Sequence, residues 1–333
     1  MSYQSEIITY QFQELFYNHF DKSIDKIERL KADASNRKIY RLISGYTSCV
    51  AVWNENVPEN RAFVEFSKGF KRGGLNVPQI YNESFDYKFY LLEDLGDTTL
   101  FKAKEGFKDQ GLTSIYYYQL ALKHLKEFQY EGLNHIDLDL CYETKQFDIQ
   151  QMMMDEEKFS NYYVSQFDEP GKYYKILNQA FEYLNSELVK ADTNFFMFRD
   201  FQPRSIMLKN DSLYFIDYQS GRKGPLHYDL ASFLYSGSIE LTDEEREFLF
   251  KSYLNDIKYK TDKKEFMKLF KFFILIRLIQ VLGSYGYSFH KNKEKKYLDK
   301  IQKALANMKS LLGQFDDKII DEFIYKLTER LNY

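Results

Sequence analysis

The chain has 333 residues, enough for a large hydrophobic core and for two lobes of one functional unit. Its hydrophobic content of 44% and charged content of 29% argue against a disordered or fibrous protein. The formal net charge of −3 provides no general attraction to nucleic acid or to an anionic membrane, so neither is expected as a partner.

Neither an export signal nor a membrane anchor is expected from the sequence. Its N-terminal residues contain no basic segment followed by an apolar run, so no signal peptide is expected. The most apolar stretch, 270–282, is interrupted by three polar residues, which favours a buried core helix over a membrane span. Cys49 and Cys141 show no metal-ligand spacing, and buried free thiols are favoured over a disulfide. We expect a cytoplasmic protein.

Strands and two helices are predicted in the first part of the chain. Apolar residues at helical spacing predict a helix over 3–20. Pro58 marks the start of a second helix, which ends at Gly73 and Gly74. Alternating and β-branched runs predict strands at 27–32, 39–43, 49–53, 77–81 and 88–92. Residues 1–94 are therefore expected to form a small, mostly β, lobe with a leading helix.

From Tyr116 onward helical spacing predominates. Helices are predicted at 113–130, 155–167, 171–191, 228–237, 243–257, 262–286 and 292–333. One hairpin interrupts them, with strands at 206–208 and 213–216 around a polar turn. Residues 95–333 are expected to form a larger helical lobe, joined to the first by a tight hinge near 94–100.

Two aspartates flank this hairpin. Asp200 follows an apolar run and opens a short loop, and Asp217 follows the second strand. We expect the hairpin to place both carboxylates at the mouth of one cleft. One carboxylate can then take a proton from a hydroxyl while the other holds Mg²⁺ against triphosphate oxygens. The alternatives are a turn or cap carboxylate for Asp200 and a Lys or Arg partner for Asp217.

The motifs around these aspartates resemble those of the aminoglycoside and choline kinase-like phosphotransferases. They are Phe198-Arg199-Asp200 with Ser205 five residues on, Asp217, and Tyr228-Asp229-Leu230. The resemblance implies an α+β, bilobal protein-kinase-like fold, in which 1–94 is the nucleotide-binding lobe and 95–333 the catalytic and acceptor-binding lobe. It also implies ATP and Mg²⁺ as cofactors and a small-molecule hydroxyl as acceptor. It implies Asp200 as the catalytic base and Asp217 as a metal ligand. It also implies that Asp229 accepts backbone N–H groups and keeps the catalytic loop rigid.

Phe198 stands where the family has His, and two further departures bear on the metal and the phosphates. Ser205 stands where the family has Asn, and its shorter side chain predicts a weaker hold on Mg²⁺, through a water molecule. The strand at 49–53 carries no Lys to contact the nucleotide phosphates. We expect Arg37, Lys38 or Arg41 to substitute, without the need for a helix glutamate partner such as Glu65.

A narrower resemblance extends over both lobes. Segments 33–41, 93–97, 199–204 and 217–230 are similar to bacterial cell-wall sugar kinases, which phosphorylate the anomeric hydroxyl of N-acetylmuramate and N-acetylglucosamine. The first segment would be the phosphate loop, although an ordinary polar hairpin is an alternative. The second would be the hinge that presents backbone groups to adenine. The nucleotide contacts implied in these two segments are Ser35, Asn36, Arg37, Arg41, Glu93 and Leu95.

Four residues are candidate acceptor contacts. They are Asp155, Arg204, Arg222 and Arg277. Asp155 is alternatively an acid that stabilises a helix N-terminus. Arg277, together with Gln280 on an otherwise apolar helix, either reaches the substrate cleft or ties helices together.

The sequence therefore predicts an ATP- and Mg²⁺-dependent kinase of a small molecule, with an amino sugar of cell-wall recycling as the favoured acceptor. An aminoglycoside or choline-like acceptor is one alternative. A pseudokinase with a nucleotide-sensing or protein-binding role is another. Ser205 and the missing strand Lys favour the pseudokinase, and the intact Asp200, Asp217 and Asp229 argue against it.

Overall fold

The computed structural model describes residues 3–30, 37–109, 113–167, 174–255, 257 and 262–329. Residue contacts divide the chain into two compact units. Unit 1 consists of Met1–Ser114, Glu127–Lys145 and Pro203–Gly221, and unit 2 of Ile115–Lys126, Gln146–Gln202 and Arg222–Tyr333. Unit 1 holds a five-stranded sheet and the rest is mostly helical, so the predicted α+β class is confirmed. The lobe boundary at 94/95 stays a prediction.

The sheet of unit 1 is antiparallel throughout, with strand order β1-β2-β3-β5-β4. Its strands are β1 (Lys26–Leu30), β2 (Lys38–Ser44), β3 (Thr47–Trp53), β4 (Ile80–Glu83) and β5 (Phe89–Glu93). In the register, Arg41 of β2 lies opposite Val50 of β3, and Ala51 lies opposite Leu91 of β5. All five strands fall on or beside the predicted ones.

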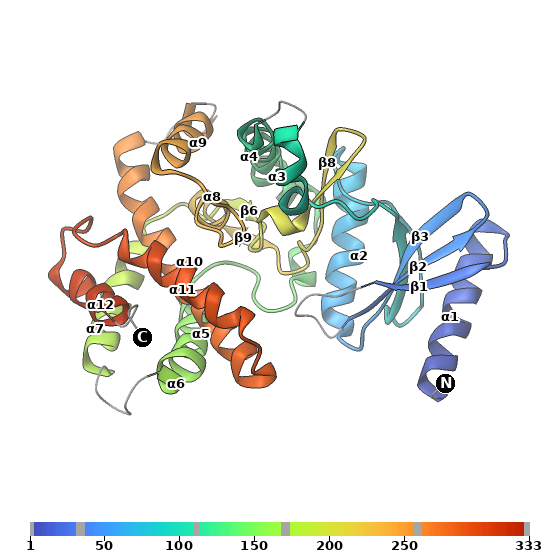
Figure 1. Cartoon of the computed structure of the whole chain (residues 1–333), viewed down its shortest axis with the longest axis horizontal. Coiled ribbons are helices and arrows are strands. Elements are labelled where there is room, and N and C mark those ends of the chain that lie inside the picture. The colour runs from blue at the N-terminus through green and yellow to red at the C-terminus, as the bar shows by residue number, and fades with distance from the viewer. Residues whose placement is uncertain are drawn as a thin grey trace. The chain divides into compact units, whose positions relative to one another are not determined.

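Two helices cover the sheet, one on each face (Figure 1). Phe89 and Tyr90 are neighbours on β5, so their side chains point to opposite faces. Phe89 packs edge-on against Phe12 of α1 (Tyr3–Phe20), with ring centroids 5.7 Å apart. Tyr90 packs against Phe63 of α2 (Val57–Arg72), at 5.6 Å. As predicted, α2 has Pro58 in its first turn and ends at Gly73.

A hairpin and a third helix complete the described part of unit 1 that bears on the site. The hairpin strands are β7 (Ile206–Lys209) and β8 (Ser212–Phe215), close to their predicted positions. Their turn residues, Asn210 and Asp211, adopt positive φ of 50° and 59°, as a tight hairpin requires. The helix α3 (Leu100–Asp109) was not predicted. The long helix α4 (Ser114–Glu131) follows it.

Unit 2 is built around α10 (Lys263–Asn292), a helix of 30 residues with many buried apolar side chains. The other helices are α5 (Ile149–Phe159), a π-helical turn (Ser160–Val164), α6 (Ser165–Phe167), α7 (Tyr174–Leu188), α8 (Leu226–Leu234), α9 (Asp243–Asn255), α11 (Lys296–Lys309) and α12 (Lys318–Thr328). Strands β6 (Phe195–Met197) and β9 (Arg222–Gly224) form a short antiparallel pair. In the chain, β6 precedes the hairpin and β9 follows it. The apolar stretch predicted as a core helix lies in α10. None of the helices in the described ranges is long and apolar enough to cross a membrane.

The prediction of a single helix over 292–333 was wrong, because two helices occupy this region. α11 ends at Lys309, and Gly313 then adopts a left-handed φ of 71°. Asp317 caps α12 by accepting the N–H groups of Ile319 and Ile320. A left-handed glycine followed by an aspartate cap is the usual pair of signals for a helix end and a new start.

Candidate active site

Asp200 lies on a loop that follows β6 in unit 2, and Asp229 holds this loop in place. The two carboxylate oxygens of Asp229 accept the backbone N–H groups of Phe198 and Arg199, at 2.6 and 2.8 Å. Asp229 stands in the first turn of α8 and is fully buried, whereas the Asp200 side chain is 40% exposed. Asp229 therefore holds the loop backbone from the protein interior, while the Asp200 carboxylate remains accessible to solvent.

Burial of Asp229 disfavours the negatively charged form of its carboxyl group. Burial raises the pKa of Asp229 to about 7, and the two backbone N–H groups and Arg277 act in the opposite direction. Each oxygen is needed as an acceptor, because each faces one N–H group. Replacing the carboxylate by an apolar side chain would leave both buried N–H groups without these partners.

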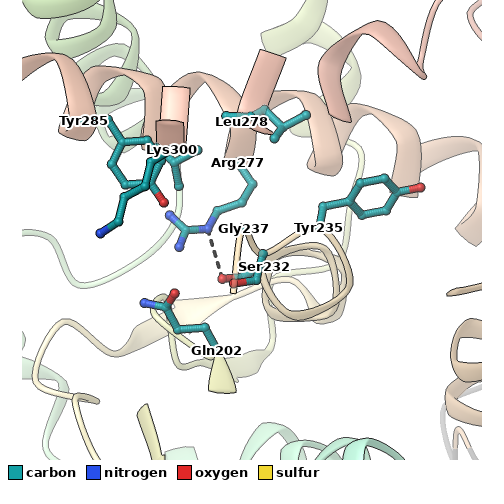
Figure 2. A pocket seen from close by; sticks show the side chains of 11 residues that line it. Gln202, Ser232, Tyr235, Gly237, Arg277, Leu278, Tyr285 and Lys300 are labelled. Carbon is teal, nitrogen blue, oxygen red and sulfur yellow. Dashed lines mark hydrogen bonds between the residues drawn. The ribbon is translucent and has the colours of Figure 1, made fainter. Parts of the chain in front are cut away.

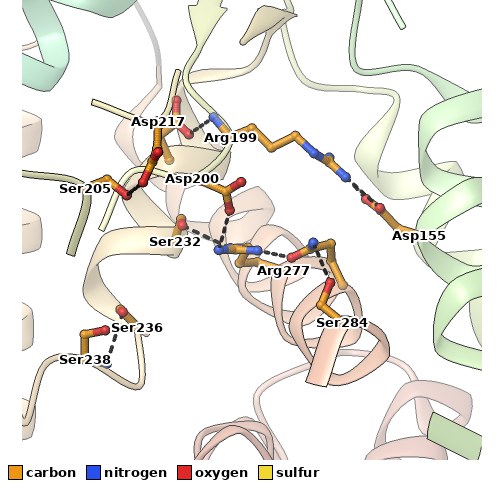
Figure 3. A network of polar contacts seen from close by, with 12 residues as sticks. Asp155, Arg199, Asp200, Ser205, Asp217, Ser232, Ser236, Ser238, Arg277 and Ser284 are labelled. Carbon is orange, nitrogen blue, oxygen red and sulfur yellow. Dashed lines mark hydrogen bonds and ion pairs between the residues drawn. The ribbon is translucent and has the colours of Figure 1, made fainter. Parts of the chain in front are cut away.

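Arg199, directly before Asp200, is held by a buried ion pair. Its backbone adopts a φ of 76°, a strained conformation for a residue other than glycine. Its guanidinium binds both oxygens of Asp155, at 2.7 and 3.3 Å, and both side chains are almost completely buried (Figure 3). Gln151 donates to Asp155 at 3.3 Å and accepts a hydrogen bond from Arg222, which is 1% exposed.

Asp155 is therefore not at a helix N-terminus, and that alternative was wrong. It lies within α5, whose first turn is capped by Asp148. Its carboxylate supports the segment around Arg199. The acceptor contacts predicted for Asp155 and Arg222 stay predictions.

Arg277 of α10 contacts both a neighbouring helix and the Asp200 carboxylate (Figure 3). Its Nε donates to the hydroxyl of Ser232 on α8 at 3.0 Å, and its Nη2 lies 3.3 Å from Asp200 Oδ1. A third N–H group donates to Gln280. The Arg277 side chain is only 8% exposed, so the Asp200 carboxylate is held by a group that lies in the protein interior.

In unit 1, Ser205 precedes the hairpin and Asp217 follows it, and their side chains lie close together. Ser205 Oγ is 3.4 Å from Asp217 Oδ2, and the N–H of Ile216 donates to the Ser205 carbonyl at 3.0 Å. Asp217 adopts a left-handed φ of 66°, and its side chain is 45% exposed. The next residue, Tyr218, anchors this turn, because its buried ring stacks on Phe63 at 5.1 Å. Its hydroxyl lies 2.6 Å from the Ser67 hydroxyl.

Arg37 joins Asp217 to a glutamate of α2. Its Nη1 lies 3.7 Å from Asp217 Oδ1, and its Nη2 donates to Glu59 Oε1 at 2.5 Å. Arg37, one of the three candidate substitutes for the strand Lys, thus pairs with a helix glutamate, Glu59, and its contact with the nucleotide phosphates stays a prediction. Glu65 instead binds Lys68 at 3.0 Å. Sequence reasoning missed Glu59 because its spacing after the cap residue Asn56 is typical of a helix cap.

The predicted hinge is tied down by ion pairs. Arg41 binds both oxygens of Asp94, at 2.7 and 3.0 Å, and also reaches Asp97. Burial alone would raise the pKa of Asp94, but the hydrogen bonds from Arg41 and from the Gly96 N–H lower it below its usual value. Lys209 of β7 donates to Glu93 at 3.0 Å and to the Asp94 carbonyl at 2.9 Å.

The remaining residues predicted to contact the nucleotide or the acceptor are Leu95, Arg204, Ser35 and Asn36. Leu95 is buried, and Arg204 stacks over the Phe101 ring of α3 at 3.7 Å from its centroid. Ser35 and Asn36 lie outside the described residues.

Asp217 and Ser205 fit a magnesium ion. Within the described ranges, no group of three or more His, Cys, Asp or Glu side chains is arranged to hold a metal. Mg²⁺ in nucleotide sites requires fewer protein ligands, because it usually binds one or two protein oxygens together with phosphates and waters. A carboxylate and a hydroxyl 3.4 Å apart, the former exposed, meet that requirement.

Comparison with known proteins identifies a family and a relative of this chain. The model of the phosphotransferase enzyme family matches residues 26–266. A protein of Neisseria meningitidis serogroup B, named N-acetylmuramate/N-acetylglucosamine kinase, is 26% identical over 299 residues, which cover 85% of each chain.

Two solved structures show the same fold. A choline kinase of Streptococcus pneumoniae matches with a TM-score of 0.61 and 16% identity, over 93% of this chain and 100% of that one. An ADP-bound aminoglycoside phosphotransferase matches with a TM-score of 0.62 and 13% identity, over 90% and 97%. They confirm the predicted kinase-like fold. Because the family model spans more than half of the sequence, this chain belongs to the phosphotransferase enzyme family and is a small-molecule kinase.

Proposed function

We propose that the protein transfers the γ-phosphoryl group of ATP to the anomeric hydroxyl of an amino sugar, with Mg²⁺ as the cofactor. The observation that carries this proposal is the presentation of Asp200, an accessible carboxylate on a loop pinned by a buried Asp229 and oriented by Arg277. The similarity to the Neisseria kinase over 85% of both chains supports an amino-sugar acceptor.

Asp200 is proposed to accept the proton of the attacking hydroxyl. A general base must be held within hydrogen-bonding distance of the proton that it removes. Arg277 and the Asp229-bound loop supply that orientation before the acceptor binds, so little reorganisation is required during the reaction. Asp155 contributes indirectly by fixing Arg199 next to Asp200.

The nucleotide is proposed to contact residues of unit 1. Asp217 and Ser205 would hold Mg²⁺, which neutralises charge on the phosphate oxygens when it is bound. Arg37, oriented by Glu59, would contact the phosphates. Ser35 and Asn36 are proposed as further phosphate contacts. The backbone at Glu93 and Leu95 would face adenine. Arg41 is proposed to act through Asp94, by keeping this segment in shape.

Release of ADP tests this proposal against its alternatives. The full chain is incubated with Mg²⁺·ATP and, separately, with N-acetylglucosamine, N-acetylmuramate, an aminoglycoside and choline. ADP release with the amino sugars, and a phosphate on the anomeric carbon by ³¹P NMR, would support it. Turnover of the aminoglycoside or choline alone would replace it with a cationic acceptor. Nucleotide binding without any turnover would indicate a pseudokinase. Asp200→Asn serves as the control for a contaminating kinase.

A further inference from the structure

The cavity beside Arg277 in unit 2 is too small for a ligand other than water. Gln202, Ser232 and Tyr285 line it together with Arg277 (Figure 2), and its volume is about 20 Å³. Roughly 10 to 15 Å³ already holds one water molecule, so no larger group fits. This cavity therefore offers no further ligand site, in contrast to the open edge of the sheet in unit 1.

Strand β1 forms that open edge. It is the first strand in the sheet order and, within the described ranges, pairs with β2 alone. The Lys26 side chain is 65% exposed, and Ile27, although apolar, is 36% exposed. An edge strand presents outward-facing backbone N–H and C=O groups that can pair with a further strand. β1 can therefore accept a strand from another chain.

The two edges of the sheet differ in regularity. At the opposite edge, the pairing of β4 with β5 is irregular between Ile80 and Asn82, and such irregularities commonly protect an edge from further pairing. β1 pairs with β2 in unbroken register over all of its five residues. β1 is therefore the edge with the strand geometry that a partner requires.

The residues of this edge are complementary to their own reverse order. The segment reads Asp25-Lys26-Ile27-Glu28-Arg29. In an antiparallel pair of two copies centred on Ile27, this residue meets its own copy. Lys26 then lies opposite Glu28 of the other copy, and Asp25 lies opposite Arg29. Directly opposite residues share a face of the sheet, so each of these pairs brings opposite charges together.

The other registers in which two copies share faces lose this match. Centring the pair on Lys26 or on Glu28 brings identical charges together at the axis. It also places a charged residue opposite Ile27. Like charges directly opposite each other are destabilising. Charges usually protect an edge strand from pairing, but these charges admit one register of a second copy.

Contacts within one copy keep the charges along this edge. Lys26 Nζ binds Glu28 Oε1 at 2.5 Å, so two copies would place two such ion pairs side by side with alternating charge. Asp25 is exposed and extends the strand, because its N–H donates to the Ile43 carbonyl of β2 at 2.8 Å. Its Oδ2 accepts the Gly45 N–H at 2.8 Å, which fixes the carboxylate.

We propose that two copies of this protein associate edge to edge through β1, antiparallel, with the two-fold axis at Ile27. The partner is a second copy and not an unrelated strand, because the order of charges matches its own reverse. The two sheets then form one continuous antiparallel sheet. An edge of five residues is a small interface, so the dimer depends on protein concentration.

Sedimentation equilibrium of the full chain measures the association. Wild type should pass from monomer to dimer as its concentration rises. Lys26→Glu places a carboxylate opposite Glu28 at two symmetric positions and should raise the dimer Kd about tenfold. Adding Glu28→Lys exchanges the two charges and should restore the dimer. Lys251→Glu is the matched control, because Lys251 forms an exposed ion pair with Glu247 on α9.

Cysteine cross-linking tests the register and leaves most of the charges in place. The background is Cys141→Ser, because Cys141 is partly exposed whereas Cys49 is buried. Ile27→Cys should form an intermolecular disulfide on oxidation, since opposite Cα atoms in antiparallel strands lie about 4.5 to 5.5 Å apart, within disulfide range. Glu28→Cys should not, because its two copies would be displaced by two positions along the strands.

The results decide the proposal even where a charge variant does not fold, because Ile27→Cys keeps all of the charges. A wild-type chain that stays monomeric at about 1 mM would overturn it, since a micromolar Kd gives mostly dimer there. A dimer that Lys26→Glu leaves unchanged, or one that cross-links at position 28 and not at position 27, would also overturn it. Cross-linking confined to Ile27→Cys, with association lost in Lys26→Glu and restored by the charge exchange, would support it.

Discussion

Left-handed backbone occurs next to both proposed catalytic carboxylates. Arg199, before Asp200, and Asp217 itself have φ of 76° and 66°. Such conformations cost residues other than glycine about 1 to 3 kcal/mol, and surrounding contacts must maintain them. Asp155 and Asp229 provide these contacts for Arg199, and the buried Tyr218 provides them for Asp217. The structure thus holds each carboxylate in an orientation that the isolated segment would rarely adopt.

Asp200→Asn is expected to lower turnover by ~10² to 10⁴ while the Kd for nucleotide changes little, because the amide can pair with neighbours but cannot accept the hydroxyl proton. The measurement is single-turnover phosphoryl transfer, with nucleotide affinity measured separately. Asp211→Asn, in the exposed turn of the hairpin, is the control and should behave as wild type. Full activity in Asp200→Asn would remove Asp200 from the chemistry.

Ser205→Asn is expected to lower the Mg²⁺ concentration for half-maximal ADP release about fivefold, which corresponds to about 1 kcal/mol. The amide oxygen of Asn reaches further than the Ser hydroxyl and is a better ligand for a hard cation. Ser205 lies beside Asp217, so the longer side chain would act at the same ion. Superimposable Mg²⁺ titrations for the two proteins would show that residue 205 does not touch the metal. Ser212→Asn, at an exposed position, is the control.

Close packing between α10 and the segment after α5 shapes the helical unit. A Cβ on Gly286 would lie 2.2 Å from the backbone oxygen of Tyr162, and one on Gly283 would lie 2.8 Å from the Phe159 nitrogen. Tyr162 lies in the π-helical turn, Ser160–Val164, and Phe159 directly precedes that turn. Gln166 also donates to the Gly286 carbonyl at 3.1 Å. Only glycine permits this approach of two backbones, because any side chain would separate them.

Gly286→Ala should therefore destabilise the protein, by about 1 to 3 kcal/mol, since a backbone atom and not a flexible side chain blocks the added methyl group. Denaturant unfolding measures the free energy. Gly106→Ala is the matched control, because a Cβ there meets nothing within 4 Å and alanine favours a helix. Equal stability of Gly286→Ala and wild type would show that α10 shifts without cost.

A buried carboxyl on α5 predicts a pH dependence of stability. Burial raises the pKa of Glu156 from 4.5 to about 7; a hydrogen bond from Asn185 lowers it and the charge of Asp155 raises it further. The folded state thus binds the proton more tightly than the unfolded state. The free energy of unfolding that Glu156 contributes therefore falls as the pH rises from about 4.5 to 7.

Glu156→Gln removes this titration and keeps the shape of the side chain. Relative to wild type, the variant should gain stability between pH 5 and pH 8, on the order of 2 kcal/mol. Thermal or denaturant unfolding at both pH values measures the change. Glu157→Gln, exposed on the same helix, is the control for a general charge effect. A stability difference that is the same at pH 5 and pH 8 would contradict the raised pKa.

For the molecule as a whole, Mg²⁺·ADP should raise the melting temperature. A ligand at a hundredfold excess over its Kd stabilises the folded state by ~2.7 kcal/mol, which corresponds to roughly 5 °C in a chain of this size. The shift should depend on Mg²⁺, and Asp217→Ala should lose the Mg²⁺-dependent part. The same shift in wild type with and without Mg²⁺ would argue against a metal at Asp217. Asp211→Ala is the control.

The type of most elements could be predicted from the sequence, because helices and strands depend on local periodicity and on turn residues. Pro58 and Gly73 marked the ends of α2, and the polar turn between β7 and β8 marked the hairpin. The misses were also local. α3 combines lysines and a glycine, which weakens its apolar pattern, and the break after α11 depends on Gly313 and an aspartate cap.

By itself, the sequence determined the α+β class, the kinase family and the positions of its aspartate motifs, since these depend on short segments read in order. Only the tertiary structure decided which side chains meet. Arg37 with Glu59, Arg199 with Asp155 and Arg277 with Asp200 join residues far apart in the chain. A charged side chain on a helix or strand has many possible partners in the unfolded chain. Packing of whole elements brings one of them within reach, and burial then makes that pairing necessary.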